Sequence, residues 1–385
     1  MNILMMASSK RIGLTYHLTQ LSLALKQSGH NVIVVASSGE QQRGLKKLLE
    51  NADIPLFILP TIDTISLKML KFNALQLSRI IDKKDIDVIH ANGLAHLFYA
   101  YFGRRMSSRK PALVMTVHSY FHGEPYARIY LIIECVLLNL FTDLVLPVSS
   151  MTSNELTKSG LPSRKIMVVY NGLNLKTFDE SLMKKVSSSR IQTIINEISG
   201  KPIVISMGSQ LVPRKGHVYL LKAIKYVKDE YSNIRCVITG TGPLLGKLKK
   251  MAYSLGIADN VIFTGYLRYE DMLQILKLAN VAIITSLSET FCHAIIEPLA
   301  AKKPIITTPV GVAPEVIKYN VGLIVPKKDS KALANAIVYL FDNPEKANEM
   351  GLKGRKVCEM MFSIEKIVNM LEKAYILALA NSCAE

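Results

Sequence analysis

The sequence predicts an α/β protein with two parallel-sheet domains of similar size, on three observations. Short apolar runs rich in Val and Ile alternate along the chain with segments of helical periodicity, and this alternation is typical of buried parallel strands covered by helices. The alternation pauses at 179–200, a polar and serine-rich stretch that we interpret as a linker. It resumes at 201, where a second strand-first unit begins.

The predicted elements fall on both sides of this linker. Strands are predicted at 2–6, 31–36, 55–59, 86–90, 112–117, 144–148, 166–170, 202–207, 234–239, 261–264, 281–285, 304–307 and 322–325, and helices at 14–28, 66–83, 93–105, 216–231, 244–255, 269–279 and 330–341. We therefore expect domains at 1–178 and 201–363. A last helix is predicted within 364–385, and it could cross back to the first domain.

Composition narrows the classes of function. The net charge of +17 is spread over both halves of the chain, so it suits anionic lipid or phosphorylated substrates as well as nucleic acid. The chain has no Trp, no aromatic RNA-binding motif and no zinc-finger spacing, which leaves nucleic acid with little support. The five cysteines lack CxxC pairing and are typical of reduced thiols in a cytoplasmic protein. For Cys292 we favour a space-filling role over that of a nucleophile.

Two apolar segments raise the question of a membrane. The start of the chain, 1–7, is too short and too soon polar for a signal peptide, and it is predicted to be a strand. The run 129–141 is shorter than the roughly 20 residues that a spanning helix needs. We expect a buried helix there, so that any membrane contact would be peripheral.

Two glutamates eight positions apart, Glu289 and Glu297, are the most informative feature of the chain. Glu289 follows the predicted strand 281–285, and Glu297 lies on the predicted helix that follows. Eight residues of helix rise by roughly 12 Å, enough to hold two ends of a small molecule. The free N–H groups at the start of this helix would suit a phosphate.

Other strand ends carry glycines and cations. Arg214 and Lys215 precede the predicted helix 216–231, where two cations could neutralise a diphosphate, although a solvated loop is the plainer interpretation without the glutamates. Gly13 at the first strand-helix turn permits close approach to a ligand, or simply makes a tight turn. Gly240-Thr-Gly242 suggests a dinucleotide fingerprint, but the third glycine is one residue late and no acidic residue ends the next strand, so NAD is disfavoured.

Histidines and an acidic pair complete the candidates. His118 ends a predicted buried strand, where an imidazole can bond a hydroxyl or phosphate oxygen. His90 and His96 are interpreted as structural. Asp85 and Asp87 have the spacing of a metal-binding DxD, but they precede a strand and so lie at its wrong end, which favours a helix-strand loop.

Taken together, these motifs resemble the retaining GT-B glycosyltransferases of family GT4, over nearly the whole chain. The resemblance rests on Gly13, 29–30, 87–90, His118, 169–178, 213–216, 240–243, 263–267, the Glu289-x7-Glu297 spacing and 308–315. It implies a GT-B fold, in which two Rossmann-like domains face each other, the C-terminal one binding a nucleotide-sugar and the N-terminal one most of the acceptor.

The resemblance also assigns roles, which we state as expectations. Lys215, with Arg214, pairs with the donor diphosphate, and the helix starting near Thr290 and Phe291 helps to hold it. Glu289 binds the sugar hydroxyls, Glu297 the ribose, and the main chain at Leu267 the base. Gly13 and Gly240 belong to the loops around the donor, and His118 touches the sugar and assists the reaction. No cofactor and no obligatory metal is implied, and the leaving phosphate takes the proton of the acceptor.

The sequence departs from the family pattern beside the donor pocket. Ser209-Gln210 stands where Gly-Arg is usual, Thr290 and Cys292 replace glycines near the first glutamate, and Lys303, Val312 and Asn174 replace Gly, Gly and Asp. These changes put the identity of the sugar in doubt and leave room for a non-catalytic relative.

We therefore expect a cytoplasmic enzyme that moves a hexose or N-acetylhexosamine from a nucleotide-sugar to a lipid-linked or polysaccharide acceptor. The alternatives are a nucleotide-sugar epimerase or phosphorylase of the same architecture, although no pyridoxal-lysine site is evident, and a non-catalytic binding protein. The segments 68–72 and 104–110 combine cations with apolar residues and suggest docking on an anionic membrane face, or else solvated helix faces.

Overall fold

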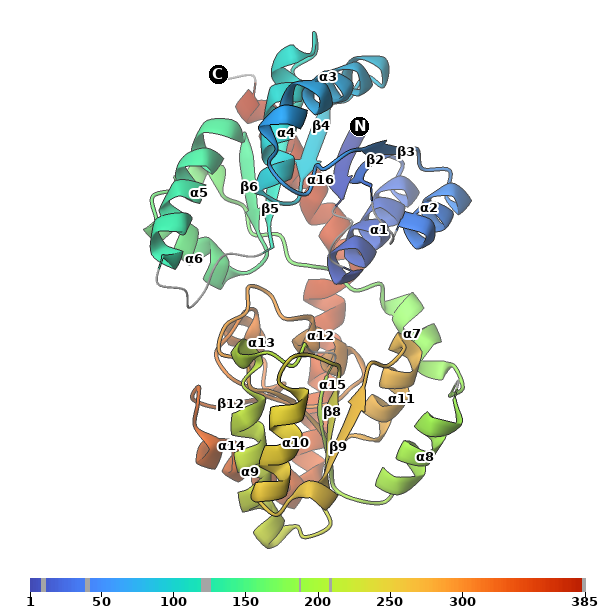
Figure 1. Cartoon of the computed structure of the whole chain (residues 1–385), viewed down its shortest axis with the longest axis vertical. Helices are drawn as coiled ribbons and strands as arrows, with labels where there is room; N and C mark the ends of the chain where they lie inside the picture. Colours follow the sequence, from blue (N-terminus) through green and yellow to red (C-terminus); the bar gives the residue numbers. More distant parts are fainter. Residues whose placement is uncertain (8–11, 39–41, 119–125, 187, 208–209, 383–385) are drawn as a thin grey trace. The chain divides into compact units, whose positions relative to one another are not determined.

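The computed structural model describes residues 1–7, 12–38, 42–118, 126–186, 188–207 and 210–382. Two compact units divide the chain: unit 1 comprises 1–172 and 364–385, and unit 2 comprises 173–363. Each is built on one six-stranded parallel sheet with helices (Figure 1). Two parallel-sheet domains were predicted, and the structure confirms this α/β fold class. Ser209 and Cys383, both singled out in the sequence, lie outside the described residues.

The sheet of unit 1 has the strand order β3-β2-β1-β4-β5-β6. Its strands are β1 (Asn2–Ala7), β2 (Asn31–Ser37), β3 (Leu56–Leu59), β4 (Val88–Ala91), β5 (Ala112–Val117) and β6 (Leu144–Pro147). Its helices are α1 (Ile12–Gln27), α2 (Gln42–Asn51), α3 (Leu67–Lys83), α4 (Leu94–Met106), α5 (Ala127–Phe141), α6 (Ser150–Lys158) and α16 (Ile364–Ser382). The central strands are buried on both faces, as their continuous Val/Ile runs predict.

The sheet of unit 2 has the order β12-β11-β10-β7-β8-β9. Its strands are β7 (Ile203–Ser206), β8 (Arg235–Thr239), β9 (Val261–Gly265), β10 (Val281–Ile284), β11 (Ile305–Thr307) and β12 (Gly322–Ile324). Its α-helices are α7 (Leu175–Met183), α8 (Ser189–Ile198), α9 (His217–Glu230), α10 (Leu245–Ser254), α11 (Tyr269–Leu278), α12 (His293–Ala300), α13 (Ala313–Ile317), α14 (Ser330–Asp342) and α15 (Pro344–Val357).

The C-terminal helix α16 returns to unit 1, where its apolar face joins the core beside β1 and β5 (Figure 1). Its Tyr375 hydroxyl lies 2.8 Å from Nδ1 of His90, whose Nε2 lies 2.6 Å from the hydroxyl of Thr116. Burial lowers the pKa of His90 to about 3. His90 is therefore a neutral, hydrogen-bonded core residue, as the sequence suggested.

Outside the candidate site, three of the predicted elements differ from the structure. The segment 179–200 is not a bare linker, because it contains the end of α7 and all of α8 and belongs to unit 2. Residues 166–170 form only an isolated bridge to β6. Met167 and Val169 donate N–H bonds to β6, but the last β6 residue is Pro147, which has no N–H to return. The predicted buried helix over 129–141, α5, is buried along only one face.

Candidate functional site in unit 2

The strand order of unit 2 places the two most informative motifs side by side. The chain order reverses between β7 and β10, which are neighbours in the sheet. In open parallel sheets, ligands bind at the carboxyl ends of the strands at this topological switch point. The loop after β7 carries Arg214 and Lys215, and the loop after β10 carries Glu289. Sequence positions 70 or more residues apart therefore meet at one edge of the sheet.

Glu289 is the centre of a charged cluster. Its Oε1 lies 2.7 Å from Nζ of Lys215 and its Oε2 lies 3.2 Å from Nη1 of Arg214. The hydroxyl of Ser286 donates to Oε1 over 3.0 Å. Burial alone would raise the pKa of Glu289, but the two cations and these hydrogen bonds outweigh it and lower the pKa. The carboxylate is thus ionised at neutral pH, and the cluster keeps one excess positive charge.

Backbone contacts fix the distance between the two loops. The N–H of Leu287 donates to the carbonyl of Arg214 over 2.7 Å, and the Thr285 hydroxyl donates to the carbonyl of Lys215 over 2.9 Å. Gly216 has a φ of +68°, and a Cβ there would stand 2.1 Å from the carbonyl oxygen of Thr285. Glycine is therefore required at this position both for its backbone conformation and for the close approach.

The helix expected from Thr290 begins later, at His293. The delay has a physical cause, because Cys292 adopts a left-handed φ of +77° and the buried ring of Phe291 is held in place. The N–H of Val312 donates to the Phe291 carbonyl over 3.1 Å. Glu297 is consequently one turn into α12 rather than two. The buried Cys292 thiol has a pKa raised to about 12, chiefly by burial, which suits a space-filling role.

Two histidines that the sequence did not single out are the first residues of helices beside the cluster. His217 begins α9, directly after Gly216, and His293 begins α12. Burial lowers the pKa of both imidazoles to about 4; the charge of Lys215 adds to this effect, and at His293 the charge of Glu289 opposes it. Both rings are neutral at pH 7. The only sequence signal was their place at a loop-helix junction, which many structural histidines share.

Glu297 lies in a different environment from Glu289. Burial raises the pKa of Glu297 to about 7, and a hydrogen bond with the side chain of Tyr269 opposes that rise only in part. Tyr269 is the first residue of α11. It follows Leu267, which lies in the loop after β9, by two positions. The structure thus brings the start of α11, two residues after Leu267, beside Glu297.

The glycines after β8 allow the loop after β8 to pack closely against the loop that carries Arg214 and Lys215. Gly240 has a φ of +108°, and its N–H donates to the carbonyl of Gly265 over 2.9 Å. Gly242 lies so close to Leu211 that a Cβ would stand 2.5 Å from the Leu211 nitrogen. The Gly-Thr-Gly sequence therefore holds the loop after β7 against the loop after β8. Gln210, next to Leu211, is exposed.

The two predicted site residues of unit 1 lie on its own carboxyl edge. Gly13 is in the first turn of α1, and His118 directly follows β5. Nε2 of His118 lies 3.0 Å from Oδ1 of Asn92, and the ring of His17 makes an edge contact with it at 6.1 Å between centroids. The side chains of His118, Asn92 and His17 line one small cavity. His90 of β4 and residues of β5 and α16 also line it.

The remaining candidate residues are paired with other side chains of the protein, which is typical of structural residues. Asp85 and Asp87 precede β4, and both pair with Arg109. His96 lies 3.3 Å from Asp63, with both side chains almost fully buried. Among the described residues, no group of three or more His, Cys, Asp or Glu could hold a metal ion.

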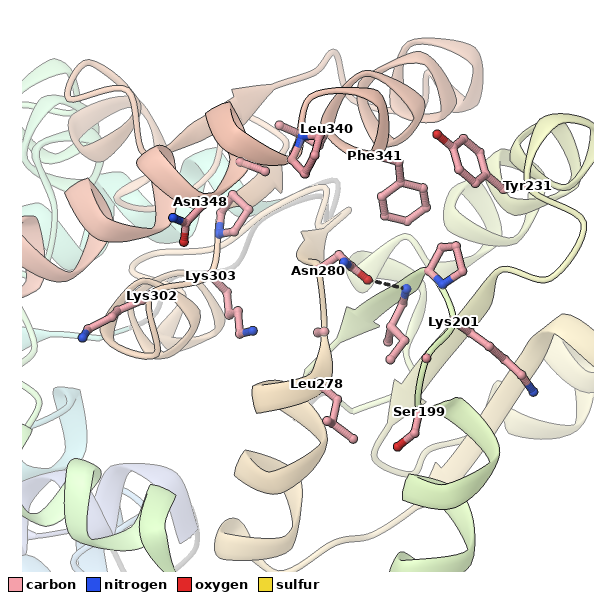
Figure 2. Close-up of a pocket in the computed structure, with 17 residues that line it drawn as sticks. Ser199, Lys201, Tyr231, Leu278, Asn280, Lys302, Lys303, Leu340, Phe341 and Asn348 are labelled. Atoms are coloured by element: carbon pink, nitrogen blue, oxygen red, sulfur yellow. Dashed lines mark hydrogen bonds between the residues drawn. The ribbon is translucent and has the colours of Figure 1, made fainter.

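A larger cavity of about 620 Å³ opens elsewhere in unit 2, and Figure 2 shows its lining. It lies at the amino ends of β7, β10 and β11, where Asn280 accepts a hydrogen bond from the N–H of Ile203 over 2.8 Å. Lysines 201, 302 and 303 line it, and Lys303 donates to the carbonyl of Lys277 at the end of α11. None of the residues predicted to bind a ligand belongs to this lining. Lys303, expected beside the donor pocket, lies here instead, because it lies two residues before the start of β11.

Comparison with known proteins identifies the class. The family described as Glycosyltransferase Family 4 matches residues 12–177, and Glycosyl transferases group 1 matches residues 188–357. The structure of Anabaena Alr3699/HepE in complex with UDP matches with a TM-score of 0.80 at 21% identity, covering 97% of this chain and 99% of that one. The chain is therefore a glycosyltransferase with the GT-B fold.

It belongs to the glycosyl transferases of group 1. It is 23% identical over 323 residues to N-acetyl-alpha-D-glucosaminyl L-malate synthase of Bacillus anthracis, covering 78% of this chain and 77% of the relative. It is 26% identical over 292 residues, 73% of each chain, to a GDP-mannose-dependent alpha-(1-6)-phosphatidylinositol monomannoside mannosyltransferase of Mycobacterium tuberculosis. The matched part is 44% of the length of one curated relative and 90% of the length of another.

The contact at Gly216 yields a stability prediction. Gly216→Ala should lower the free energy of unfolding by roughly 2–4 kcal/mol, because the left-handed φ is strained for alanine and its Cβ meets the Thr285 carbonyl. Gly246→Ala is the matched control, since Gly246 lies in α10 with nothing near its Cβ position. Urea unfolding followed by circular dichroism measures both. Equal stability of the two variants would show that the loops are not locked here.

Proposed function

We propose that the chain is a retaining glycosyltransferase that moves a hexose or N-acetylhexosamine from a nucleotide-sugar to a hydroxyl of a lipid-linked or polysaccharide acceptor. The observation that carries this proposal is the cluster of Lys215, Arg214 and Glu289 at the switch point of unit 2. It combines an excess positive charge with an ionised carboxylate, which is what a diphosphate joined to a sugar requires.

The cations take the diphosphate in this proposal. Lys215 is the inner cation, with its side chain 16% exposed, and Arg214 is the outer one, 52% exposed. The first N–H groups of α9 and α12 add partial positive charge at the two helix starts. Because His217 and His293 are neutral at pH 7, the positive charge comes from Lys215 and Arg214. A divalent metal is then not obligatory, and the nucleotide-sugar is a substrate rather than a cofactor.

The two glutamates recognise hydroxyl groups at opposite ends of the donor. Glu289, kept ionised by its neighbours, accepts hydrogen bonds from the sugar. Glu297, beside Tyr269 and the loop of Leu267, accepts those of the ribose, and the Leu267 main chain meets the base. Thr290 and Phe291 shape the turn between the two glutamates.

The comparisons do not identify the nucleotide base of the donor, because one relative uses GDP-mannose and one structural neighbour is bound to UDP. A thermal-shift panel of UDP-, GDP- and ADP-sugars would identify it, since a ligand of the native state raises the melting temperature.

The proposed reaction proceeds on one face of the sugar. The bond from the anomeric carbon to the phosphate oxygen breaks, and its electron pair stays on the nucleoside diphosphate. The acceptor oxygen bonds to the anomeric carbon from the same side, and its proton passes to the departing phosphate oxygen. Lys215 and Arg214 stabilise the charge that develops on this phosphate. His118 contacts the sugar, Gly13 permits a close approach to the phosphates, and no general-base carboxylate is needed.

A lipid-linked acceptor is supported by one relative. The mycobacterial relative acts on a phosphatidylinositol mannoside, whereas the bacillus relative is named for an L-malate acceptor. No helix within the described ranges is long and apolar enough to cross a membrane. We propose a cytoplasmic enzyme that meets a lipid-linked acceptor at the surface of an anionic membrane. Four described cysteines are buried and free, which fits a reducing compartment.

Removing the inner cation should strongly slow transfer. Lys215→Met is expected to reduce kcat/KM by about a hundredfold or more, because a preorganised charge at the leaving phosphate is lost. Glu289→Ala should reduce kcat/KM to a similar extent, because the sugar hydroxyls lose their hydrogen-bond acceptor. The measurement is release of nucleoside diphosphate with and without acceptor, and Lys302→Met, at the amino edge of the sheet, is the control.

Three other outcomes would replace this proposal. Equally slow release by wild type and Glu289→Ala would indicate a non-catalytic binding protein. Conversion of the sugar without an acceptor would indicate an epimerase. A product of inverted anomeric configuration would remove the retaining mechanism.

Donor affinity should depend on pH through Glu297. Ribose hydroxyls donate to the ionised carboxylate, whose pKa in the ligand-free protein is raised to about 7 by burial. Binding therefore releases a proton, and affinity should rise about tenfold between pH 6 and pH 8 before it levels off. Calorimetric titration measures this, and Glu297→Gln should bind more weakly with a flat profile. An unchanged profile in that variant would place the titrating group elsewhere.

A further inference from the structure

Helix α5 presents the largest run of exposed apolar side chains in unit 1. Seven large hydrophobic residues between positions 126 and 140 are at least 45% exposed: Tyr126, Ile129, Tyr130, Ile132, Ile133, Val136 and Leu140. Soluble proteins rarely leave so many apolar side chains together in water. We call these seven residues the α5 face.

The α5 face is one continuous side of the helix. At 100° per residue its members fall within an arc of roughly 160°. The opposite side holds Glu134, Cys135 and Leu138, all buried, and the last two belong to the core of unit 1. With 15 residues, α5 is about 22 Å long and is too short to span a bilayer. One side of α5 is apolar and exposed, and the opposite side is covered by the core, which is the geometry of a helix lying in an interface.

Three arginines on and beside α5 are exposed. Arg128 is exposed on the helix itself. At the other end, the ring of Tyr101 stacks on Phe141 at 4.3 Å, and the exposed Arg105 lies over that Tyr101 ring. Lys165 caps α5 through the carbonyl of Asn139, which brings its exposed neighbour Arg164 to the same end.

Two acids of the described residues, one within α5 and one just after it, are withdrawn from its surface. Glu134 is the single acid within α5, and it is buried, with a pKa raised to about 7 by that burial. Asp143, just after the helix, is buried and pairs with Arg104 over 2.8 Å. The exposed charges identified on and beside α5 in the described part of the chain are thus three arginines, which complement an anionic surface and not a cationic one.

We infer that the α5 face docks unit 1 on an anionic lipid bilayer, with α5 parallel to the membrane plane. Apolar side chains enter the boundary between headgroups and acyl chains, Tyr126 and Tyr130 lie at the level of the headgroups, and Arg105, Arg128 and Arg164 meet lipid phosphates. The inference rests on the proposed lipid-linked acceptor and names the surface that reaches it. It assigns the main apolar contact to α5 instead of the segment 68–72.

Cosedimentation of the full chain with vesicles tests this inference. The vesicles contain phosphatidylcholine with and without phosphatidylglycerol, at low and high salt. Wild type should bind the anionic vesicles and release them as salt rises, because salt screens the cations. Ile133→Asp should weaken that binding about tenfold or more, and Ile133→Gln, which keeps helix propensity, should weaken it less but measurably.

Two controls match the exposure of Ile133. Phe72→Asp changes a residue that is 47% exposed on α3, and Leu352→Asp one that is 46% exposed on α15 in unit 2. Both variants should bind vesicles within about twofold of wild type, since each loses a single apolar side chain outside the α5 face. Loss of binding in Phe72→Asp but not in Ile133→Asp would overturn the inference in favour of α3.

Two further results would overturn it. Equal binding of wild type and both Ile133 variants would exclude the α5 face. A lipid-free dimer that Ile133→Asp dissociates in sedimentation velocity would make the face a self-interface. Thermal shift with a nucleotide-sugar in the same samples separates this inference from the proposed function. Donor binding should persist in every variant, whereas its absence in wild type would defeat the proposed function and leave the vesicle result standing.

Discussion

The ion pair between Lys215 and Glu289 is the interaction on which the candidate site depends. It joins two loops that leave neighbouring strands at the point where the chain order of the sheet reverses. A buried carboxylate without a partner would take up a proton, and a buried ammonium would lose one. Lys215, together with Arg214, therefore keeps Glu289 ionised. The glycine that follows Lys215 allows the loops to approach closely enough for a 2.7 Å contact.

Near this pair, the surroundings of two glutamates shift their pKa values in opposite directions. Glu289 and Glu297 are the same residue type on one loop-helix segment, yet the pKa of Glu289 is lowered and that of Glu297 is raised to about 7. The difference comes from neighbours, because two cations contact Glu289, whereas Tyr269 is the contact that opposes burial at Glu297. The two carboxylates are suited to hold different ends of a polar molecule. Neither has the paired arrangement of a general acid and base.

The sequence predicted the parallel strands and the meeting of the two motifs, because buried Val/Ile runs and strand-end loops are local signals that topology then brings together. It did not predict where α12 starts, since a left-handed cysteine such as Cys292 leaves no mark in a periodicity pattern. His217 and His293 were missed because a histidine at a helix start is chemically ambiguous without its neighbours. The exposed side of α5 was missed for a similar reason: an apolar run gives no sign of which side the core covers.

The most direct test of the central claim is a crystal structure of the chain with a bound nucleoside diphosphate. The predicted result is a diphosphate within hydrogen-bonding distance of the Lys215 ammonium, with the ribose at Glu297 and the base at the main chain of Leu267. A diphosphate bound instead in the cavity of Lys201, Lys302 and Lys303, at the amino ends of the strands, would contradict the account.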